Sequence, residues 1–136
     1  PFCRMKSLIA FLFVTSSFVT IGQTIKSLKK YKPIDEFENI HVQMICEDEH
    51  QSSFIIWVKN HVQEHYHSQH TENIVVLSGK GLMTLGDRVF TISKGDFINI
   101  PKGTKHSVKK VHSHSPLKVL SVQTPLWDPK DRTITE

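Results

Sequence analysis

The strongest constraint on the fold of this chain is the pattern of short apolar runs and turn residues from Ile40 to Thr124. In this part, short runs of β-branched and aromatic residues alternate with glycine, proline and aspartate. Runs of this length, bounded by residues that favour turns, are typical of β-strands. Strands are predicted at residues 40–46, 53–59, 73–78, 81–85, 88–92, 96–100, 106–111 and 117–124. This number of short strands, without a long helical pattern, predicts an all-β sandwich or barrel.

Two connections between these runs have clear turn chemistry. Gly86 and Asp87 join two alternating segments through a loop of only two residues, which predicts a tight hairpin. The segment 93–96 has the sequence Ser-Lys-Gly-Asp and predicts a second reversal. Both connections fit antiparallel strands that are neighbours in sequence.

The first 22 residues resemble an export signal. Arg4 and Lys6 supply positive charge, an apolar run covers 8–21, and small residues at 20–22 offer a cleavage site. The alternatives are an uncleaved membrane anchor and an ordinary first helix. The run is interrupted by polar residues at 15–17 and is shorter than the roughly 20 residues of a spanning helix. We therefore expect export to the periplasm or the extracellular space, with no membrane span in the mature form.

The charge of the chain does not point to nucleic acid. The sequence has 17 lysines and arginines against 13 acidic residues, and loss of Arg4 and Lys6 with the signal would leave 15 against 13. Lysines cluster at 26–32 and 109–110, but no nucleic-acid motif accompanies them. We interpret both clusters as solvated surface and expect no nucleic-acid partner.

Cysteine usage excludes an internal disulfide in an exported form. Cys3 would leave with the signal, so Cys46 would remain alone. We expect Cys46 to be a buried apolar residue rather than a reactive thiol.

The remaining segments complete the expected organisation of the chain. Residues 1–22 would be the signal, 23–39 a polar lead with one helical turn or an extended arm, 40–124 the barrel, and 125–136 a tail. The tail is expected to run along the surface with Trp127 packed against the barrel and to carry no chemistry.

One segment, 61–72, contains four histidines and two glutamates. Because side chains alternate along a strand, His65 and His67 would share one face. Residues 68–71 can turn the chain so that Glu72 faces the same point. Later in the chain, a turn shaped by Pro101 and Gly103 can direct His106 inward. Two imidazoles and a carboxylate form a set that binds first-row divalent metals.

These residues resemble the two motifs of the cupin superfamily. The first motif, H-x-H, four residues, E, six residues, G, is matched by His65, His67, Glu72 and Gly79. The second, G, five residues, P-x-G-x-x-H, is matched by Gly95, Pro101, Gly103 and His106. Lys59 stands where a glycine commonly opens the first motif, and Lys110 where an asparagine commonly closes the second. Neither position is a metal ligand in the family.

The resemblance implies a jelly-roll barrel of the double-stranded β-helix type. It also implies one divalent transition metal, which could be zinc, manganese, iron, nickel or copper, with open positions toward the barrel mouth. Its ligands would be His65, His67, Glu72 and His106. The resemblance to small cupins also implies a homodimer in which the partner covers an exposed edge strand, and we expect one here.

Other polar residues are expected to lie outside the site. His61 lies about 13 Å along a strand from His65, and His70 is placed in a loop as an exposed polar residue, with a contact near the site as the alternative. His112 and His114 are expected in a solvated loop, and Glu64 as a surface charge. Four residues are candidates for lining a pocket, although core packing is favoured for them: Trp57, Met83, Ile98 and Gln123.

Three classes of function follow from this pattern. The first is an exported metalloenzyme of dioxygenase, isomerase or decarboxylase type that acts on a small organic substrate through the open metal position. The alternative is a non-catalytic module that binds a small molecule or sugar. A purely structural protein is disfavoured because it gives no reason to keep four ligands.

Overall fold

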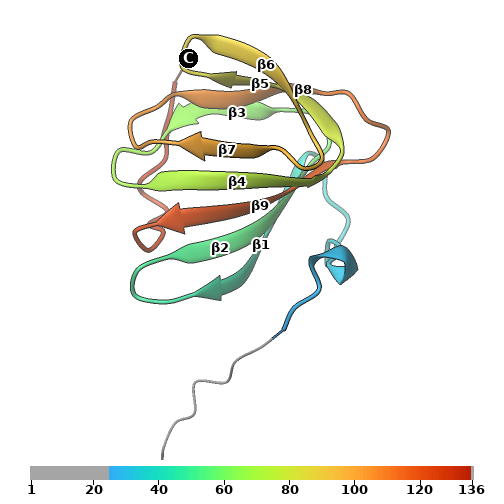
Figure 1. Cartoon of the computed structure of the whole chain (residues 1–136), viewed down its shortest axis with the longest axis horizontal. Coiled ribbons are helices and arrows are strands. Elements are labelled where there is room, and N and C mark those ends of the chain that lie inside the picture. The colour runs from blue at the N-terminus through green and yellow to red at the C-terminus, as the bar shows by residue number, and fades with distance from the viewer. Residues whose placement is uncertain (1–24, 136) are drawn as a thin grey trace, which may run out of the picture.

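Two five-stranded sheets face each other in the computed structural model, which describes residues 25–135 (Figure 1). In spatial order, the first sheet consists of β1 (Ile40–Glu47), β2 (Ser52–Val58), β9 (Leu117–Thr124), β4 (Thr71–Ser78) and β7 (Phe97–Ile100). The second consists of β10 (Thr133–Ile134), β3 (Val62–Tyr66), β8 (His106–Val111), β5 (Lys80–Leu85) and β6 (Arg88–Ser93). All paired strands are antiparallel, as in a jelly roll.

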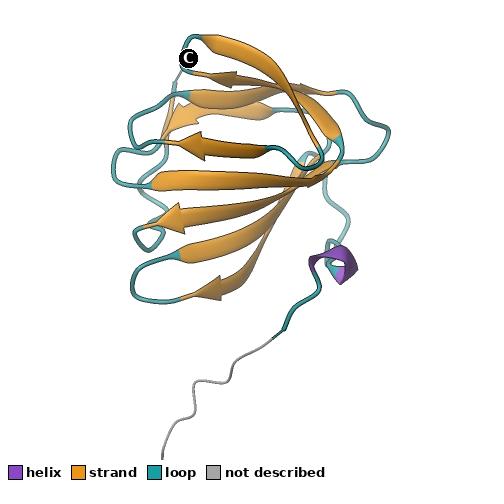
Figure 2. Cartoon of the chain, in the orientation of Figure 1, coloured by secondary structure: helices purple, strands orange, loops and turns teal. Residues whose placement is uncertain are grey.

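The predicted all-β fold is confirmed, and strands dominate the described chain (Figure 2). Each of the predicted runs forms a strand whose ends lie within two residues of the expected positions. Two strands, β3 and β10, were not among these runs. The Gly86–Asp87 hairpin is confirmed, because Leu85 pairs with Arg88 across it and Gly86 has φ 55.

The hydrophobic core lies between the sheets. It is formed by strand residues that alternate inward, and it consists of Val58, Val76, Met83, Ile92, Ile98, Ile100, Val108, Leu117 and Val119. The inward face of a strand in such a sandwich is apolar because its partner sheet excludes water from it.

The polar lead before β1 packs against the outer face of the first sheet. It contains one 3₁₀ turn, η1 (Leu28–Lys30). The Lys118 ammonium of β9 donates to the carbonyl oxygens of Leu28 (2.7 Å) and Tyr31 (2.8 Å). The Phe37 ring contacts His41, which in turn contacts the buried Trp57. These contacts explain why β2 is buried on both faces.

We expect Lys118→Met to loosen this lead. The substitution keeps the aliphatic stem but removes two hydrogen bonds from a charged donor, at a cost on the order of 2 kcal/mol. Amide hydrogen exchange at residues 28–31 should become faster. Lys109→Met, at an exposed position of β8, is the control and should leave exchange unchanged. Equal protection of the lead in both variants would contradict this account.

Gly79 lies so close to the backbone of Leu117 that no side chain fits at this position. Its φ is +88, and a Cβ placed there would lie 2.7 Å from the Cα of Leu117. Gly79→Ala is therefore expected to destabilise the fold by on the order of 3 kcal/mol, measured by denaturant unfolding. Gly95→Ala is the matched control, since Gly95 also has positive φ (+98) but a Cβ there meets nothing within 4 Å. A cost no larger than that of Gly95→Ala would show that the contact with Leu117 is unimportant.

The prediction for Cys46 was wrong. Cys46 is a free, exposed cysteine on β1. The reason is that β1 is an edge strand, and its pairing with β2 shifts register between Met44 and Cys46. An apolar run at the edge of a sheet does not guarantee burial.

The expected signal at residues 1–22 lies outside the described residues. Within residues 25–135, no helix is long and apolar enough to cross a membrane.

Candidate metal centre

Three histidines meet at one end of the space between the sheets. His65 is on β3, His67 follows that strand directly, and His106 begins β8, where it pairs with His65 across the ladder. Each of the three can offer a ring nitrogen within 4.8 Å of those of the other two. The ring centroids of His65 and His106 are 4.2 Å apart, and all three side chains are buried. The expected convergence of His106 with the histidine pair is therefore observed.

Backbone carbonyls orient all three rings. The Nδ1–H groups donate to the carbonyl oxygens of Gln63 (from His65, 2.8 Å), Asp131 (from His67, 2.6 Å) and Thr104 (from His106, 3.0 Å). A carbonyl oxygen only accepts, so each Nδ1 carries a hydrogen and each Nε2 of a neutral ring keeps its lone pair. Hydrogen bonding of the other ring nitrogen is how proteins fix metal-binding imidazoles.

Burial favours the neutral form of His65 and His67. It lowers the pKa of His65 to about 3, and the neighbouring His106 ring acts in the same direction. Burial also lowers the pKa of His67, although its contacts with Asp131 and Glu72 act in the opposite direction. Neutral imidazole is the form that binds a metal ion.

Glu72 reaches the histidines from the opposite sheet. It is the second residue of β4, and its Oε2 lies 3.3 Å from Nε2 of His106 and 4.0 Å from Nε2 of His67. Its Oε1 accepts a hydrogen bond from the Ser121 hydroxyl (2.5 Å). Burial raises the pKa of Glu72, but its contacts with His106 and Ser121 outweigh burial and lower the pKa to about 2. The site therefore contains a buried, ionised carboxylate beside the histidine rings.

This donor set fits a divalent ion. With Nδ1 of His106 donating to Thr104, the buried Nε2 of His106 makes no hydrogen bond within residues 25–135. This Nε2 lies 3.3 Å from Oε2 of Glu72, so a cation shared by the two atoms, either a proton or a metal ion, would stabilise the pair. Three nitrogens and one carboxylate oxygen are suitable ligands for first-row transition metals.

The turn before β8 is tied to the first histidine motif. Gly103, with φ 78, donates its N–H to the carbonyl oxygen of His67 (2.6 Å), and Thr104 donates to the carbonyl of Pro101 (3.1 Å). This turn places His106 at the start of β8 and inside the sandwich, as the sequence predicted.

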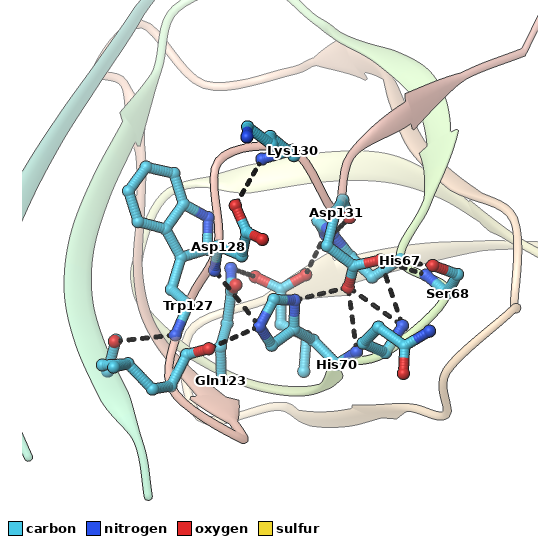
Figure 3. Close-up of polar contacts among 12 residues, drawn as sticks. His67, Ser68, His70, Gln123, Trp127, Asp128, Lys130 and Asp131 are labelled. Carbon is cyan, nitrogen blue, oxygen red and sulfur yellow. Dashed lines mark hydrogen bonds and ion pairs between the residues drawn. The ribbon is translucent and has the colours of Figure 1, made fainter. Parts of the chain in front are cut away.

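The C-terminal tail contributes a residue that the sequence did not reveal. The buried Asp131 carboxylate accepts hydrogen bonds from the N–H groups of Ser68 (2.8 Å), Gln69 (3.0 Å) and His70 (3.0 Å), and from the Ser68 hydroxyl (Figure 3). Burial raises the pKa of Asp131, but these hydrogen bonds outweigh it and hold the pKa below its usual range. We call Asp131 and the loop 68–70 the tail anchor. The tail is therefore tied to the loop before β4 through a buried carboxylate, which the sequence analysis did not anticipate.

His70 is also buried, at 2% exposure, and the prediction of an exposed residue was wrong. Its Nδ1 lies 2.5 Å from Oδ2 of Asp131, and its Nε2 lies 2.8 Å from the carbonyl oxygen of Leu126 (Figure 3). His67, His70 and Asp131 are close enough to form a second metal-binding group. However, the Asp131 oxygens already accept several hydrogen bonds, so we interpret this cluster as the tail anchor.

The remaining candidates lie outside the metal centre. His61, His112 and His114 are exposed, and the last two are in the loop between β8 and β9, as predicted. Glu64 is not a free surface charge, because it accepts a hydrogen bond from the Thr135 hydroxyl (2.8 Å). Trp127 packs its ring against Phe54 but remains 37% exposed.

A cavity of about 400 Å³ opens from the histidine cluster between the sheets. Met83 and Gln123 line it, whereas Trp57 and Ile98 do not. Most of its wall is aliphatic, and Arg132 of the tail contributes a positive charge. The volume is within the usual range of about 300–1,000 Å³ for small-molecule sites.

Comparison with known proteins identifies the family. The model of the cupin domain (Cupin_2) matches residues 53–123. An uncharacterized protein of Aquifex aeolicus (strain VF5) is 31% identical over 118 residues, which cover 81% of this chain and 96% of that protein. Quercetin 2,3-dioxygenase of Bacillus subtilis (strain 168) is 34% identical over 74 residues, or 54% of this chain and 21% of that enzyme.

A solved structure agrees with these matches. The protein with a double-stranded beta-helix domain from Klebsiella pneumoniae subsp. pneumoniae MGH 78578 superposes with a TM-score of 0.70 at 17% identity, covering 85% of this chain and 99% of that one. At this level of sequence identity, the similarity shows a shared fold alone. From the family match, the relatives and the two motifs together, this chain belongs to the cupin family.

Proposed function

We propose that this protein is a metal-dependent cupin enzyme that acts on a small organic molecule in the barrel cavity. The observation that carries the proposal is the set of buried imidazoles whose Nδ1 atoms are all held by carbonyl groups, which leaves their Nε2 atoms for one ion next to Glu72. The partial match to quercetin 2,3-dioxygenase supports an enzymatic role.

In this proposal His65, His67, Glu72 and His106 hold one divalent ion. When bound, the ion supplies a Lewis acid that polarises an oxygen of the substrate. The chain itself supplies the binding and the exclusion of water. The aliphatic wall of the cavity removes the substrate from solvent, and Ser121 keeps the Glu72 carboxylate oriented through Oε1.

The test of catalysis compares three preparations of one protein: as purified, stripped by a chelator, and reloaded with single metals. Each is incubated with a library of small phenols, acids and keto acids, and consumption is followed by mass spectrometry. The proposal expects turnover that disappears on stripping and returns on reloading. Turnover that is unaffected by complete metal removal would contradict it.

A second candidate is a binding module without catalysis. It is favoured by the titratable side chains that line the cavity, because within residues 25–135 these are limited to the four metal-site residues and Arg132. None is left over as a separate general acid or base. Tight retention of a small molecule by the metal-loaded protein, without its conversion across the same library, would support this alternative.

We also propose export and a homodimer. Export rests on the sequence of residues 1–22 alone, and sequencing the N-terminus of the protein isolated from its native compartment tests it. The dimer is supported by edge strand β1, where Ile40, Val42 and Met44 are exposed on one face. Light scattering should then give twice the mass of one chain, and a monomer mass at micromolar concentration would contradict it.

A further inference from the structure

We propose that the cavity selects a small organic anion with an apolar body, with its charged group lying between the metal centre and Arg132. The inference rests on the proposed function, because one of the two positive charges that would hold the anion is the metal ion. It goes further by naming the class of ligand and by giving Arg132 a role.

The wall of the cavity is suited to an apolar body. Thirteen of its twenty lining residues are apolar; twelve come from strands of both sheets, and Trp127 comes from the tail. Phe54 and Ile56 of β2 and Ile74 of β4 belong to the first sheet, and Met83 and Val108 belong to the second. A polyhydroxylated ligand would lose its hydrogen bonds with water against this wall and find few partners in return. The wall therefore disfavours sugars.

The polar groups of the cavity are gathered at the metal centre. His65, His67, Glu72 and His106 are all in the lining, together with Gln123. An amphipathic molecule in the cavity can therefore place its polar end here and its apolar end against the aliphatic wall. This arrangement fixes the orientation of the ligand, as a few convergent polar groups do in small-molecule sites.

Arg132 adds a positive charge at this polar end. None of the ion pairs among residues 25–135 includes its guanidinium, although it lines the cavity. Its place in the chain brings it to the metal centre, because the carbonyl oxygen of the preceding Asp131 accepts from Nδ1 of His67, and Ile134, two residues further on, pairs with His65. The guanidinium is thus within electrostatic reach of the metal centre.

The balance of charge favours an anion. Glu72 is the only carboxylate in the described cavity lining. A divalent ion together with Arg132 exceeds the charge of Glu72, so the polar end would be positive. A guanidinium that lacks a carboxylate partner binds carboxylates and similar oxyanions through charge-assisted hydrogen bonds.

The test uses three probes and titration calorimetry on the full chain, both metal-loaded and chelator-stripped. The probes are 3-phenylpropanoate, its neutral analogue 3-phenylpropanamide, and gluconate, which keeps the carboxylate on a polyhydroxylated body. We expect 3-phenylpropanoate to bind at least about 10-fold more tightly than either of the others. The amide isolates the contribution of charge, and gluconate isolates that of the apolar wall.

A substitution tests whether Arg132 supplies the positive charge that holds the anion. Arg132→Gln should lower the affinity for 3-phenylpropanoate by about 10-fold or more and leave the affinity for 3-phenylpropanamide within about twofold of the wild-type value. Arg132 is exposed at the cavity mouth, so this change should not disturb folding. Arg88→Gln is the matched control, since Arg88 lies on β6 near the Phe90 ring and outside the cavity lining. It should change none of the affinities.

The outcomes separate this inference from the proposed metal function. Equal affinity for the three probes, no binding of 3-phenylpropanoate at millimolar concentration, or no effect of Arg132→Gln would overturn the anion proposal even if the protein retains metal. If the protein retains no metal but still prefers 3-phenylpropanoate in a way that depends on Arg132, the metal function is wrong and the anion site stands.

Discussion

Replacing His106 with alanine is expected to lower the affinity for the metal ion by at least about 100-fold, since loss of a supporting residue alone typically costs 10–100-fold. His106 supplies one of three imidazoles and lies 3.3 Å from the Glu72 carboxylate. Without it, two nitrogens and one oxygen would remain. The measurement is metal content after dialysis, followed by competition with a chromophoric chelator to obtain the dissociation constant.

His112→Ala provides the control for this experiment. It removes an imidazole from an exposed loop outside the cavity lining, so the content of bound metal should stay at the wild-type level. Circular dichroism should show that both variants keep the β-sheet signal. Unchanged metal affinity in His106→Ala would mean that the ion, if bound, is held elsewhere.

Asp131→Asn is expected to have a large effect on stability. Asparagine has nearly the same shape, but it replaces one acceptor oxygen with an NH₂ group in a place where the N–H groups of Gln69 and His70 donate. A buried charged acceptor is lost and donors are left without a partner, so we expect a cost on the order of 3 kcal/mol. For a domain of this size, this corresponds to a midpoint of thermal unfolding lower by roughly 10 °C.

The same substitution should also weaken metal binding. The backbone carbonyl of Asp131 accepts from Nδ1 of His67, so a shift of the tail would leave this ring less well oriented. A decrease of about 10-fold is expected from loss of such support. Asp128→Asn is the control, because Asp128 is exposed in the same tail and, among residues 25–135, its carboxylate accepts only from the Lys130 N–H. If both substitutions had equal, small effects, the tail anchor would not stabilise the site.

The local part of the site could be predicted from sequence. Alternation along a strand places His65 and His67 together, and the glycines and proline before His106 mark a turn. The ladder between β3 and β8, which pairs His65 with His106, follows from the fold rather than from spacing. The family resemblance supplied that step, and the short run containing β3 was too polar to be recognised as a strand by composition.

The tail anchor could not be predicted, for a physical reason. Asp131 is about 60 residues from the loop it binds, and its own surroundings, which contain proline, lysine and aspartate, are typical of an exposed tail. Its burial, and that of His70, arises only when the tail folds back on the barrel. Cys46 was expected to be buried but is exposed, because an apolar run gives no sign that its strand will lie at the edge of a sheet.

The central claim is that side chains from both sheets hold one divalent ion, and elemental analysis tests it most directly. The wild-type protein should be purified from its native compartment without chelators and without an affinity tag that binds metal. The account predicts about one equivalent of a first-row transition metal per chain, retained through dialysis. A properly folded sample that contains less than about 0.1 equivalent, and that takes up none when zinc, manganese, iron, nickel or copper is supplied, would contradict it.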